Sequence, residues 1–334
     1  MLKKVEIKGY KSAYDVTLDL GPLTVLVGAN GSGKSSILEA IAGTTAALRN
    51  ADLQTALTWL RAEPNDVEDI ISWNEGRASV TLVDEVGVLG RFSISRAPED
   101  RFSVEVGPVK ASGASEDRVD WRTEARLLKL EPELIAQPAI SREERPTFQQ
   151  SGANAGPVLD SLPRDAIESL EVELRDVLPD VHGVRAGRKR VPGTDVVGHE
   201  PVFRVFGYDV RAKHASEGMN LVLAVLLALQ SATGPTVVLL DDLQRGLHPK
   251  AQQDVLGAIR GLLSRNPDLQ VVATTHSPYL VDALQQEEVV VVAQRAGRTH
   301  VRQLSEHPDA EQWRGELRAG EFWSAVGEDW VIDG

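Results

Sequence analysis

Cysteine is absent from the 334-residue sequence. Without a thiol, the chain cannot carry a nucleophilic cysteine, a CxxC redox pair or a zinc site with thiolate ligands. The absence is typical of a protein of the reducing cytoplasm, where disulfides rarely form, and we expect a cytoplasmic location.

A long hydrophobic run is also missing. The most apolar stretch, residues 221–229, is much shorter than the roughly 20 residues that a membrane-spanning helix requires. The first residues, MLKKVEIKGYKS, alternate between apolar and polar side chains instead of forming the apolar core of a signal peptide. We therefore expect no membrane insertion and no leader peptide.

Basic residues are outnumbered, because 36 Lys and Arg face 49 Asp and Glu and the formal net charge is −13. Phosphate contacts require clusters of Lys or Arg, so this balance argues against a protein that binds nucleic acid over its whole surface. The densest basic run, Arg185, Arg188, Lys189 and Arg190, lies in a segment bounded by glycine and proline and is predicted to be a loop. Two interpretations stay open: a solvated loop and a local contact to DNA.

Hydrophobic periodicity predicts an α/β protein with a mostly parallel core sheet. Strands are expected at residues 5–7, 16–20, 23–27, from 202 onward, and at 236–240, 270–275 and 288–293, the last of these being the final strand. Helices are expected at residues 35–48, 157–178 (two helices, broken by Pro163), 217–230 and 249–264, and from 278 onward. The β-rich runs between 78 and 109 predict an antiparallel sheet, and residues 110–155 are expected to be rich in loops.

The segment GANGSGKS at residues 28–35 has the form G-x-x-x-x-G-K-[ST] of a phosphate loop. Its glycines let the backbone wrap tightly with N–H groups turned inward, while the following helix presents its positive end to phosphates. Lys34 is predicted to reach the β- and γ-phosphates, and Ser35 to ligate Mg²⁺. A glycine-rich turn that binds nothing is disfavoured, because the motif follows an apolar strand and opens a helix. The candidate nucleotide-binding residues here are Gly28, Ala29, Asn30, Gly31, Ser32, Gly33, Lys34, Ser35 and Ser36.

Two acids, Asp241 and Asp242, follow the apolar run TVVLL. A carboxylate at the end of a buried parallel strand faces the crevice where such sheets bind ligands. Asp241 is predicted to hold Mg²⁺, and Asp242 to orient or deprotonate the attacking water. A strand that simply ends in a polar turn is the alternative, but two adjacent like charges are costly without a cation.

Two further segments carry candidate phosphate-binding residues, one before the predicted helix at 217–230 and one after the predicted strand at 270–275. Ser216 and Glu217 are placed to cap the helix that starts near 217, which is either their whole role or a means of aiming that helix start at a phosphate. His276 follows the strand QVVATT and is either a structural residue whose hydrogen bonds are satisfied within the fold or a group whose imidazole donates a hydrogen bond to a γ-phosphate. We list Lys34, Asp242 and His276 as the catalytic candidates.

The segments GANGSGKSS, HASEG, TVVLLDDLQRGLHP and VVATTHSPYLVD, in this order, resemble the phosphate loop, signature, acidic strand with D-loop and switch histidine of an ABC-type ATPase head. More narrowly, the chain is similar to the RecF-like and OLD-like, SMC-related branch of the AAA family, whose typical text is IDEPENGLHP followed by TTHSP. GYKS is similar to the NFKS start of that branch, and SGANAGPVLDSL to its DGSNLAAVL segment. The resemblance implies one P-loop NTPase head over residues 1–334, with an antiparallel β region at 78–109, a helical lid or arm insertion at 110–200 and a C-terminal lobe at 201–334.

The resemblance also implies ATP and Mg²⁺ as cofactors and a homodimer of the ATP-sandwich type. In it, Ser216, Glu217 and Gly218 of one subunit would cover the γ-phosphate held by Lys34 and Ser35 of the other. Residues 246–248 would be the D-loop at that interface, although a turn before a proline-initiated helix explains them equally well. The chain departs from the family pattern in two ways. Asp242 stands where a catalytic glutamate is usual, and the glutamine of the family's Q-loop is left unassigned among Gln137, Gln149 and Gln150.

OLD-like nucleases carry a C-terminal Toprim module, whereas only about sixty residues follow His276 here, so we expect a stand-alone head. Trp313, Phe322, Trp323 and Trp330 either cap the core or form a docking surface. We predict an ATP-hydrolysing dimeric switch in DNA repair or anti-phage defence, partnered with a separately encoded effector such as a nuclease. A slow ATP clamp that serves as a scaffold and the ATPase subunit of a transporter are the alternatives.

Overall fold

The computed structural model describes residues 1–50, 71–72, 76–84, 89–97, 101–109 and 123–332. The chain divides into two compact units, each described by itself below. Unit 1 comprises Met1–Leu127, Gly234–Leu240 and Asp268–Gly334, and unit 2 comprises Leu128–Thr233 and Asp241–Pro267. Residues 85–88 and 98–100 of the expected antiparallel region, and 110–122 of the expected insertion, lie outside the described residues.

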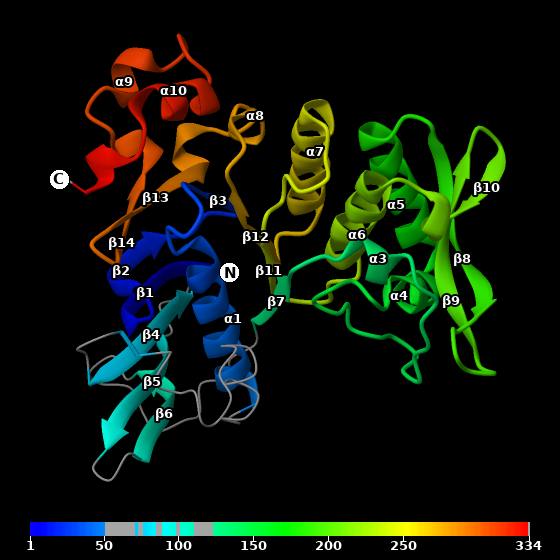
Figure 1. Cartoon of the computed structure of the whole chain (residues 1–334), viewed down its shortest axis with the longest axis horizontal. Helices are drawn as coiled ribbons and strands as arrows, with labels where there is room; N and C mark the ends of the chain where they lie inside the picture. The colour runs from blue at the N-terminus through cyan, green and yellow to red at the C-terminus, as the bar shows by residue number, and fades with distance from the viewer. Residues whose placement is uncertain (51–70, 73–75, 85–88, 98–100, 110–122, 333–334) are drawn as a thin grey trace. The chain divides into compact units, whose positions relative to one another are not determined.

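The central sheet of unit 1 has six strands in the order β14-β13-β3-β12-β11-β7 (Figure 1). Their bounds are β3 (Leu23–Val27), β7 (Glu124–Leu128), β11 (Thr236–Leu240), β12 (Leu269–Thr275), β13 (Val289–Arg295) and β14 (Arg298–Gln303). β3 is parallel to both β12 and β13, and β12 is parallel to β11, whereas β14 is antiparallel to β13. Every residue of β3, β11 and β12 is buried, which is why these strands are almost entirely apolar. The predicted mostly parallel core sheet is confirmed.

A second, antiparallel sheet of unit 1 has the order β2-β1-β4-β5-β6. Its strands are β1 (Leu2–Tyr10), β2 (Ala13–Asp19), β4 (Arg77–Asp84), β5 (Leu89–Ala97) and β6 (Arg101–Val109). Helix α1 (Lys34–Asn50) packs against both sheets, because its buried Ile37 and Ile41 belong to one apolar core with Ile7 of β1 and Val272 of β12. The core of unit 1 therefore fixes the helix that directly follows the glycine-rich segment.

The C-terminal part of unit 1 adds short helices: α8 (Pro278–Val281), α9 (Ala310–Trp313) and α10 (Ala319–Val326). Phe322 and Trp323 of α10 are buried, and the His307 ring packs edge-on against Phe322 and Trp330. These aromatic residues cap the core, as one of the two sequence interpretations held, whereas Trp313 is partly exposed.

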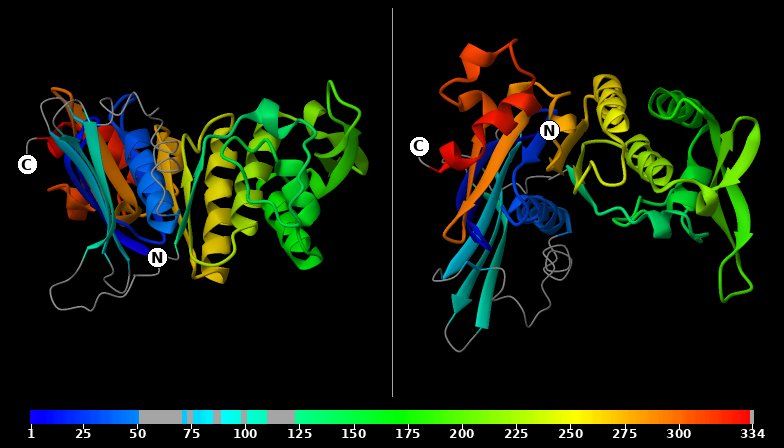
Figure 2. Two further views of the ribbon diagram at one scale, coloured as in Figure 1. Left: turned by 90° about the horizontal axis from the view of Figure 1, so that it is seen from below. Right: turned by 45° about the horizontal axis from the view of Figure 1, so that its top comes forward.

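Unit 2 combines helices with a three-stranded antiparallel sheet in the order β10-β9-β8 (Figure 2). Its strands are β8 (Val181–Arg190), β9 (Val197–Val205) and β10 (Tyr208–Arg211), and its helices are α3 (Pro132–Ile135), α4 (Ala155–Ser161), α5 (Arg164–Val177), α6 (Glu217–Gln230) and α7 (Pro249–Arg265). Helix α6 contacts α3, α5 and α7, and α4 and α5 pack on β8. Ten consecutive residues of α6, 220–229, are buried, which explains why this helix is apolar on all sides. Among the described residues, no helix is long and apolar enough to cross a membrane.

Two of the expected elements need correction, and a third segment, expected to be rich in loops, also contains a strand that the sequence did not predict. The basic segment after residue 181 is strand β8, not a loop, because its backbone pairs with β9 along its length. The region 110–155 contains β7, which forms an edge of the central sheet next to β11. The strand near 288–293 is not the last, because β14 follows it and pairs with it as a hairpin. β7 pairs with β11, which is distant in the sequence, and β8 and β14 contain charged residues. None of these three strands is a continuous apolar run.

Candidate functional site

The segment from Gly28 to Gly33 connects β3 to α1 in unit 1. Gly28, Gly31 and Gly33 have positive φ angles of 150°, 79° and 105°, which residues with a side chain rarely adopt. A Cβ atom on Gly28 would also lie 2.1 Å from the carbonyl oxygen of Val292 on β13. The spacing of glycines that predicted a phosphate loop is therefore required by the backbone itself.

Lys34, the first residue of α1, is buried, with 7% of its surface exposed. Its ammonium group donates hydrogen bonds to the carbonyl oxygens of Gly28 (2.8 Å) and Ala29 (2.7 Å). Burying an ammonium group is costly unless hydrogen bonds compensate, and the loop carbonyls supply them. The positive charge is thus held within the loop at the N-terminal end of α1, where the helix dipole also favours an anion.

The carboxyl ends of β3, β12 and β11 lie at one edge of the central sheet, because these strands are parallel. Val27, the last residue of β3, pairs with Thr275, the last residue of β12. His276, the residue after β12, therefore lies at the same edge of the central sheet as the phosphate loop, and its side chain is exposed. The next residue, Ser277, donates its backbone N–H to Oγ1 of Thr275 (3.1 Å), which fixes the turn into α8.

Asp241 and Asp242 follow β11 and belong to unit 2. The N–H of Asp241 donates to the carbonyl oxygen of Leu128 (3.0 Å), and its carboxylate lies 3.6 Å from the ammonium of Lys129. Lys129 was missed by the sequence reasoning, because no motif marks it and only the pairing of β7 brings it to the acidic residue. Asp241 therefore has a cation beside it within its own chain.

Asp242 has a φ of 57°, in the left-handed region that aspartate tolerates better than most residues. Its carboxylate accepts a hydrogen bond from Nε2 of Gln244 (3.3 Å), and its residue is exposed. The backbone turn thus leaves the Asp242 carboxylate at the surface, whereas the preceding strand is fully buried.

The start of helix α6 has the cap that the sequence predicted. Ser216 is the N-cap, and its hydroxyl accepts a hydrogen bond from the N–H of Met219 (3.2 Å). A Cβ atom on Gly218 would lie 3.0 Å from the carbonyl oxygen of Gly246, and one on Gly246 (φ 68°) would lie 2.8 Å from Leu221. The HASEG segment and the D-loop candidate at 246–248 therefore lie side by side in unit 2.

The glutamines considered for the Q-loop also belong to unit 2. Gln150 accepts the backbone N–H of Lys129 at its carbonyl oxygen (2.9 Å), and Gln149 donates its N–H to Oδ1 of Asn154 (2.9 Å). Gln137 is exposed after α3. Gln150 is the one whose backbone bonds to the residue that pairs with Asp241.

The basic run on β8 is partly neutralised by acidic neighbours. Arg185 donates to Asp209 (2.7 Å), and this guanidinium holds the pKa of the Asp209 carboxyl below its usual value. Lys189 pairs with the fully buried Glu200 (3.1 Å), and Arg190 pairs with Asp195 (3.2 Å). These pairs reduce the charge that the run presents to an anionic partner.

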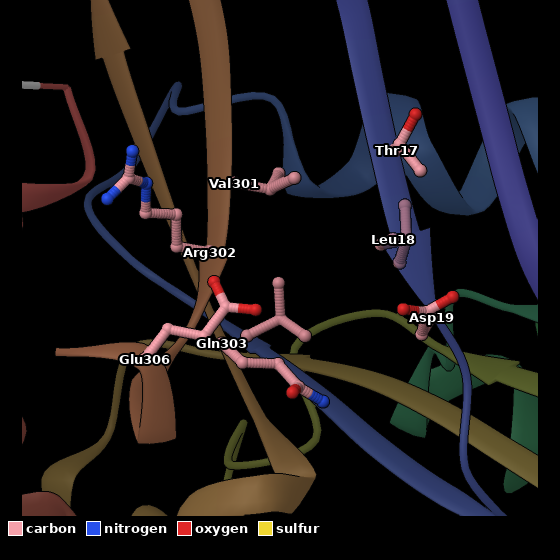
Figure 3. A pocket seen from close by; sticks show the side chains of 8 residues that line it. Thr17, Leu18, Asp19, Val301, Arg302, Gln303 and Glu306 are labelled. Atoms are coloured by element: carbon pink, nitrogen blue, oxygen red, sulfur yellow. The ribbon is translucent and has the colours of Figure 1, made fainter. Parts of the chain in front are cut away.

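A pocket in unit 1 opens between β2 and the β13–β14 hairpin (Figure 3). Asp19, Arg302 and Glu306 are its charged lining residues, and Leu18, Val290 and Val301 are its apolar ones. No residue of the phosphate loop lines it. Two of its three charged lining residues are carboxylates, which would repel the phosphates of a nucleotide.

The chain is similar to several known proteins. The family described as "AAA domain, putative AbiEii toxin, Type IV TA system" matches residues 160–282, and the family described as "AAA ATPase domain" matches residues 1–46. An OLD nuclease from Thermus scotoductus is 30% identical over 122 residues, which are 34% of this chain and 21% of that protein. The chromosome partition protein Smc of Methanocaldococcus jannaschii is 35% identical over 102 residues, which are 28% of this chain and 9% of that protein.

A solved Smc head, bound in its crystal to the C-terminal winged-helix domain of ScpA, has the same fold. The two chains superpose with a TM-score of 0.63 over 93% of this chain and 99% of that one, at 19% identity. The two family matches and this fold define the class that the chain resembles, an AAA-type ATPase domain with the fold of an SMC head. The matches span about a fifth or less of the two curated relatives.

Proposed function

We propose that the chain binds and hydrolyses ATP and works as a dimeric switch. The observation that carries the proposal is the phosphate-loop geometry at the end of β3, with Lys34 held among the loop carbonyls. Positive-φ glycines, a buried lysine and a helix start together form the chemistry that binds a triphosphate. The nucleotide-binding residues of the proposal run from Gly28 to Ser36.

Magnesium fits the donor chemistry of two residues. Ser35 offers a hydroxyl in the first turn of α1, and Asp241 offers a carboxylate after β11. Mg²⁺ prefers oxygen ligands and usually takes one or two protein groups together with phosphate oxygens and water. Ser35 and Asp241 would hold the ion beside bound ATP, where it would supply positive charge to the β- and γ-phosphates.

Catalysis is assigned to Asp242 and His276 in this proposal. Asp242 orients or deprotonates the attacking water through its exposed carboxylate, and His276 donates a hydrogen bond to the γ-phosphate. Asp241, which here pairs with Lys129, would hold the metal through its carboxylate. Because the Asp242 carboxylate is one methylene shorter than that of a glutamate, we expect slow turnover.

The signature segment completes the site of a second copy. Ser216, Glu217 and Gly218 lie at the start of α6, where helical N–H groups and the dipole favour an anion. The adjacent Gly246 forms part of the same surface of unit 2. We assign these residues to the γ-phosphate held by Lys34 of the partner copy, which makes ATP the link between two subunits.

The switch would act on another molecule. The role that we propose is DNA repair or anti-phage defence through a separately encoded effector, and the two curated relatives are named as a nuclease and a chromosome partition protein. A slow ATP clamp that serves as a scaffold is the second candidate, favoured by Asp242. Contact with DNA would use Arg188 and the neighbouring basic residues of β8, of which Arg185, Lys189 and Arg190 pair with acidic residues.

Phosphate release by the wild type and by Lys34→Ala tests the central claim. We expect slow, Mg²⁺-dependent hydrolysis by the wild type and a loss of at least about tenfold in nucleotide affinity for the variant, because the charge that meets the phosphates is gone. Measurements with and without DNA separate the switch from the clamp, since only a switch should change its rate. Equal nucleotide affinity of the two proteins in calorimetry would contradict the site.

A further inference from the structure

Thr299 of β14 lies behind the phosphate loop, and only 3% of its surface is exposed. Its Oγ1 is 2.9 Å from the carbonyl oxygen of Ser32 and 2.8 Å from the hydroxyl oxygen of Ser12. A carbonyl oxygen only accepts, so the single hydroxyl proton of Thr299 is donated to Ser32. Oγ1 of Thr299 therefore accepts the proton of Ser12, and the hydrogen bonds run from Ser12 through Thr299 to Ser32.

The bond to Ser32 fixes the orientation of one peptide unit in the loop. The peptide between Ser32 and Gly33 is planar and trans, so its C=O and N–H point in opposite directions. With the C=O directed at Thr299, the N–H of Gly33 points to the other side. In phosphate loops, backbone N–H groups cradle the phosphate oxygens, so this bond decides where one such donor points.

The peptide plane between Ser32 and Gly33 needs a hydrogen-bond partner to stay in one orientation. Glycine has few steric limits on its backbone angles, and Gly33 has a φ of 105°. A Cβ atom at this residue would lie 2.3 Å from Oγ1 of Thr299, which shows how closely the threonine packs on the loop. A peptide plane next to such a residue can rotate at low cost unless a partner holds it.

The position of β14 does not depend on the hydroxyl group of Thr299, because backbone hydrogen bonds also hold this strand. The N–H of Thr299 donates to the carbonyl oxygen of Ser12 (2.8 Å), and β14 pairs with β13 along its length. Both contacts stay when the hydroxyl of Thr299 is removed. The side-chain oxygen can therefore be tested while the strand stays in place.

We propose that Thr299 is a positioning residue that, oriented by Ser12, holds the Ser32–Gly33 peptide so that the N–H of Gly33 faces the phosphates of ATP. The inference rests on the proposed function, because it needs a nucleotide in the loop. The proposal adds Thr299 of β14 and Ser12 to the phosphate loop, which the sequence motif confines to residues 28–36.

The test compares Thr299→Ala with Thr299→Ser, which differ only in the hydroxyl group. We expect Thr299→Ser to bind a fluorescent, non-hydrolysable ATP analogue within about twofold of the wild type and Thr299→Ala to bind about tenfold more weakly, since a buried carbonyl loses its donor. The KM for ATP should rise by a similar factor, with a smaller change in kcat. Ser12→Ala added to Thr299→Ala should cause no further loss, because the two residues act in series.

Thr236→Ala and Thr236→Ser are the matched controls. Thr236 is also buried in unit 1, and its hydroxyl also donates to a carbonyl oxygen, that of Gly234 (3.1 Å), at the opposite end of β11. These variants should bind the analogue as the wild type does. Equal affinities for Thr299→Ala and Thr299→Ser, or an equal loss in the Thr236 pair, would overturn the proposal. Failure of the wild type to bind any ATP analogue would overturn the proposed function itself.

Discussion

Asp242 shows how one residue combines backbone geometry with chemistry. Its φ of 57° turns the chain immediately after a fully buried strand, and only Gly, Asn and Asp adopt such a conformation readily. Uncommon backbone angles at the end of a strand are frequent at functional sites, since the surrounding structure must hold them in place. Aspartate meets both demands here, because it tolerates the turn and carries a carboxylate.

Asp242→Asn tests the chemistry without disturbing the turn, because asparagine tolerates the same backbone angles. We expect ATP and Mg²⁺ binding to be retained and the rate of hydrolysis to fall by about 10²- to 10⁴-fold, the range typical of a lost general base. Single-turnover phosphate release measures the rate, and titration with an ATP analogue measures the affinity. A variant that hydrolyses ATP as fast as the wild type would move the catalytic role to His276 or to another residue.

At the scale of elements, helices α5, α6 and α7 share a buried carboxylate. Glu173 of α5 accepts a hydrogen bond from Gln230 of α6 (3.2 Å) and forms an ion pair with Arg265 of α7. Burial is the largest influence on this group and raises the pKa of Glu173 above its ordinary value, although Gln230 and Arg265 oppose the shift. The three helices are thus joined by a group whose ionisation is disfavoured in the folded chain.

Glu173→Gln should remove a pH dependence of stability. A raised pKa in the folded state stabilises the fold fully below the unfolded pKa of about 4.5, and this stabilisation is lost as the pH rises through the folded pKa. As the pH rises from 4.5 to 7, the free energy of unfolding of the variant should therefore increase relative to that of the wild type. Urea unfolding at several pH values measures it.

Glu168→Gln, on the exposed side of the same helix, is the control. Glu168 pairs with Arg164 at the surface and should show no such trend. A constant difference between Glu173→Gln and the wild type across this pH range would contradict the account.

At the scale of the whole molecule, the proposed sandwich divides each ATP site between two copies. Lys34 belongs to unit 1 and Ser216 to unit 2, and the proposal assigns a Lys34 and a Ser216 from different copies to the same nucleotide. A closed dimer of this kind contains two equal composite sites. Variants that damage opposite halves can therefore complement each other.

Ser216→Arg should leave nucleotide binding by the single chain intact and block closure, because a large side chain would stand against the partner's γ-phosphate. Hydrolysis should then fall by about tenfold or more. Mixed with Lys34→Ala, it forms a heterodimer in which one site carries both lesions and the other carries neither. We expect part of the hydrolysis to return in the mixture, and analytical ultracentrifugation with ATP should show the mixed dimer.

Each variant must first be shown to be folded by thermal unfolding. If the intact site needs its sibling to be occupied, hydrolysis stays low but the mixed dimer still forms. Loss of both hydrolysis and ATP-dependent association in every mixture would argue against a site shared by two copies.

Local sequence patterns were sufficient for the elements that carry the motifs. The predicted strands at 23–27 and 236–240 and the predicted helix at 217–230 agree with β3, β11 and α6. The two strands are apolar runs followed by glycine or aspartate, and the helix is an apolar run preceded by the capping Ser216, so the signals lie within a few neighbouring residues. The glycine spacing also allowed the loop to be predicted from the sequence alone, because the positive φ angles of such a loop exclude most other residues.

Tertiary structure decided what depends on distant partners. The charged strand β8 has no apolar run to mark it and is defined by its pairing with β9 and by ion pairs to Glu200 and Asp209. Lys129 meets Asp241 only because β7 lies beside β11. Thr299 reaches the loop from 267 positions further along the chain. Short-range patterns indicate a residue's own preference for helix, strand or turn, whereas the contacts of Lys129 and Thr299 exist only once the folded chain has brought remote segments together.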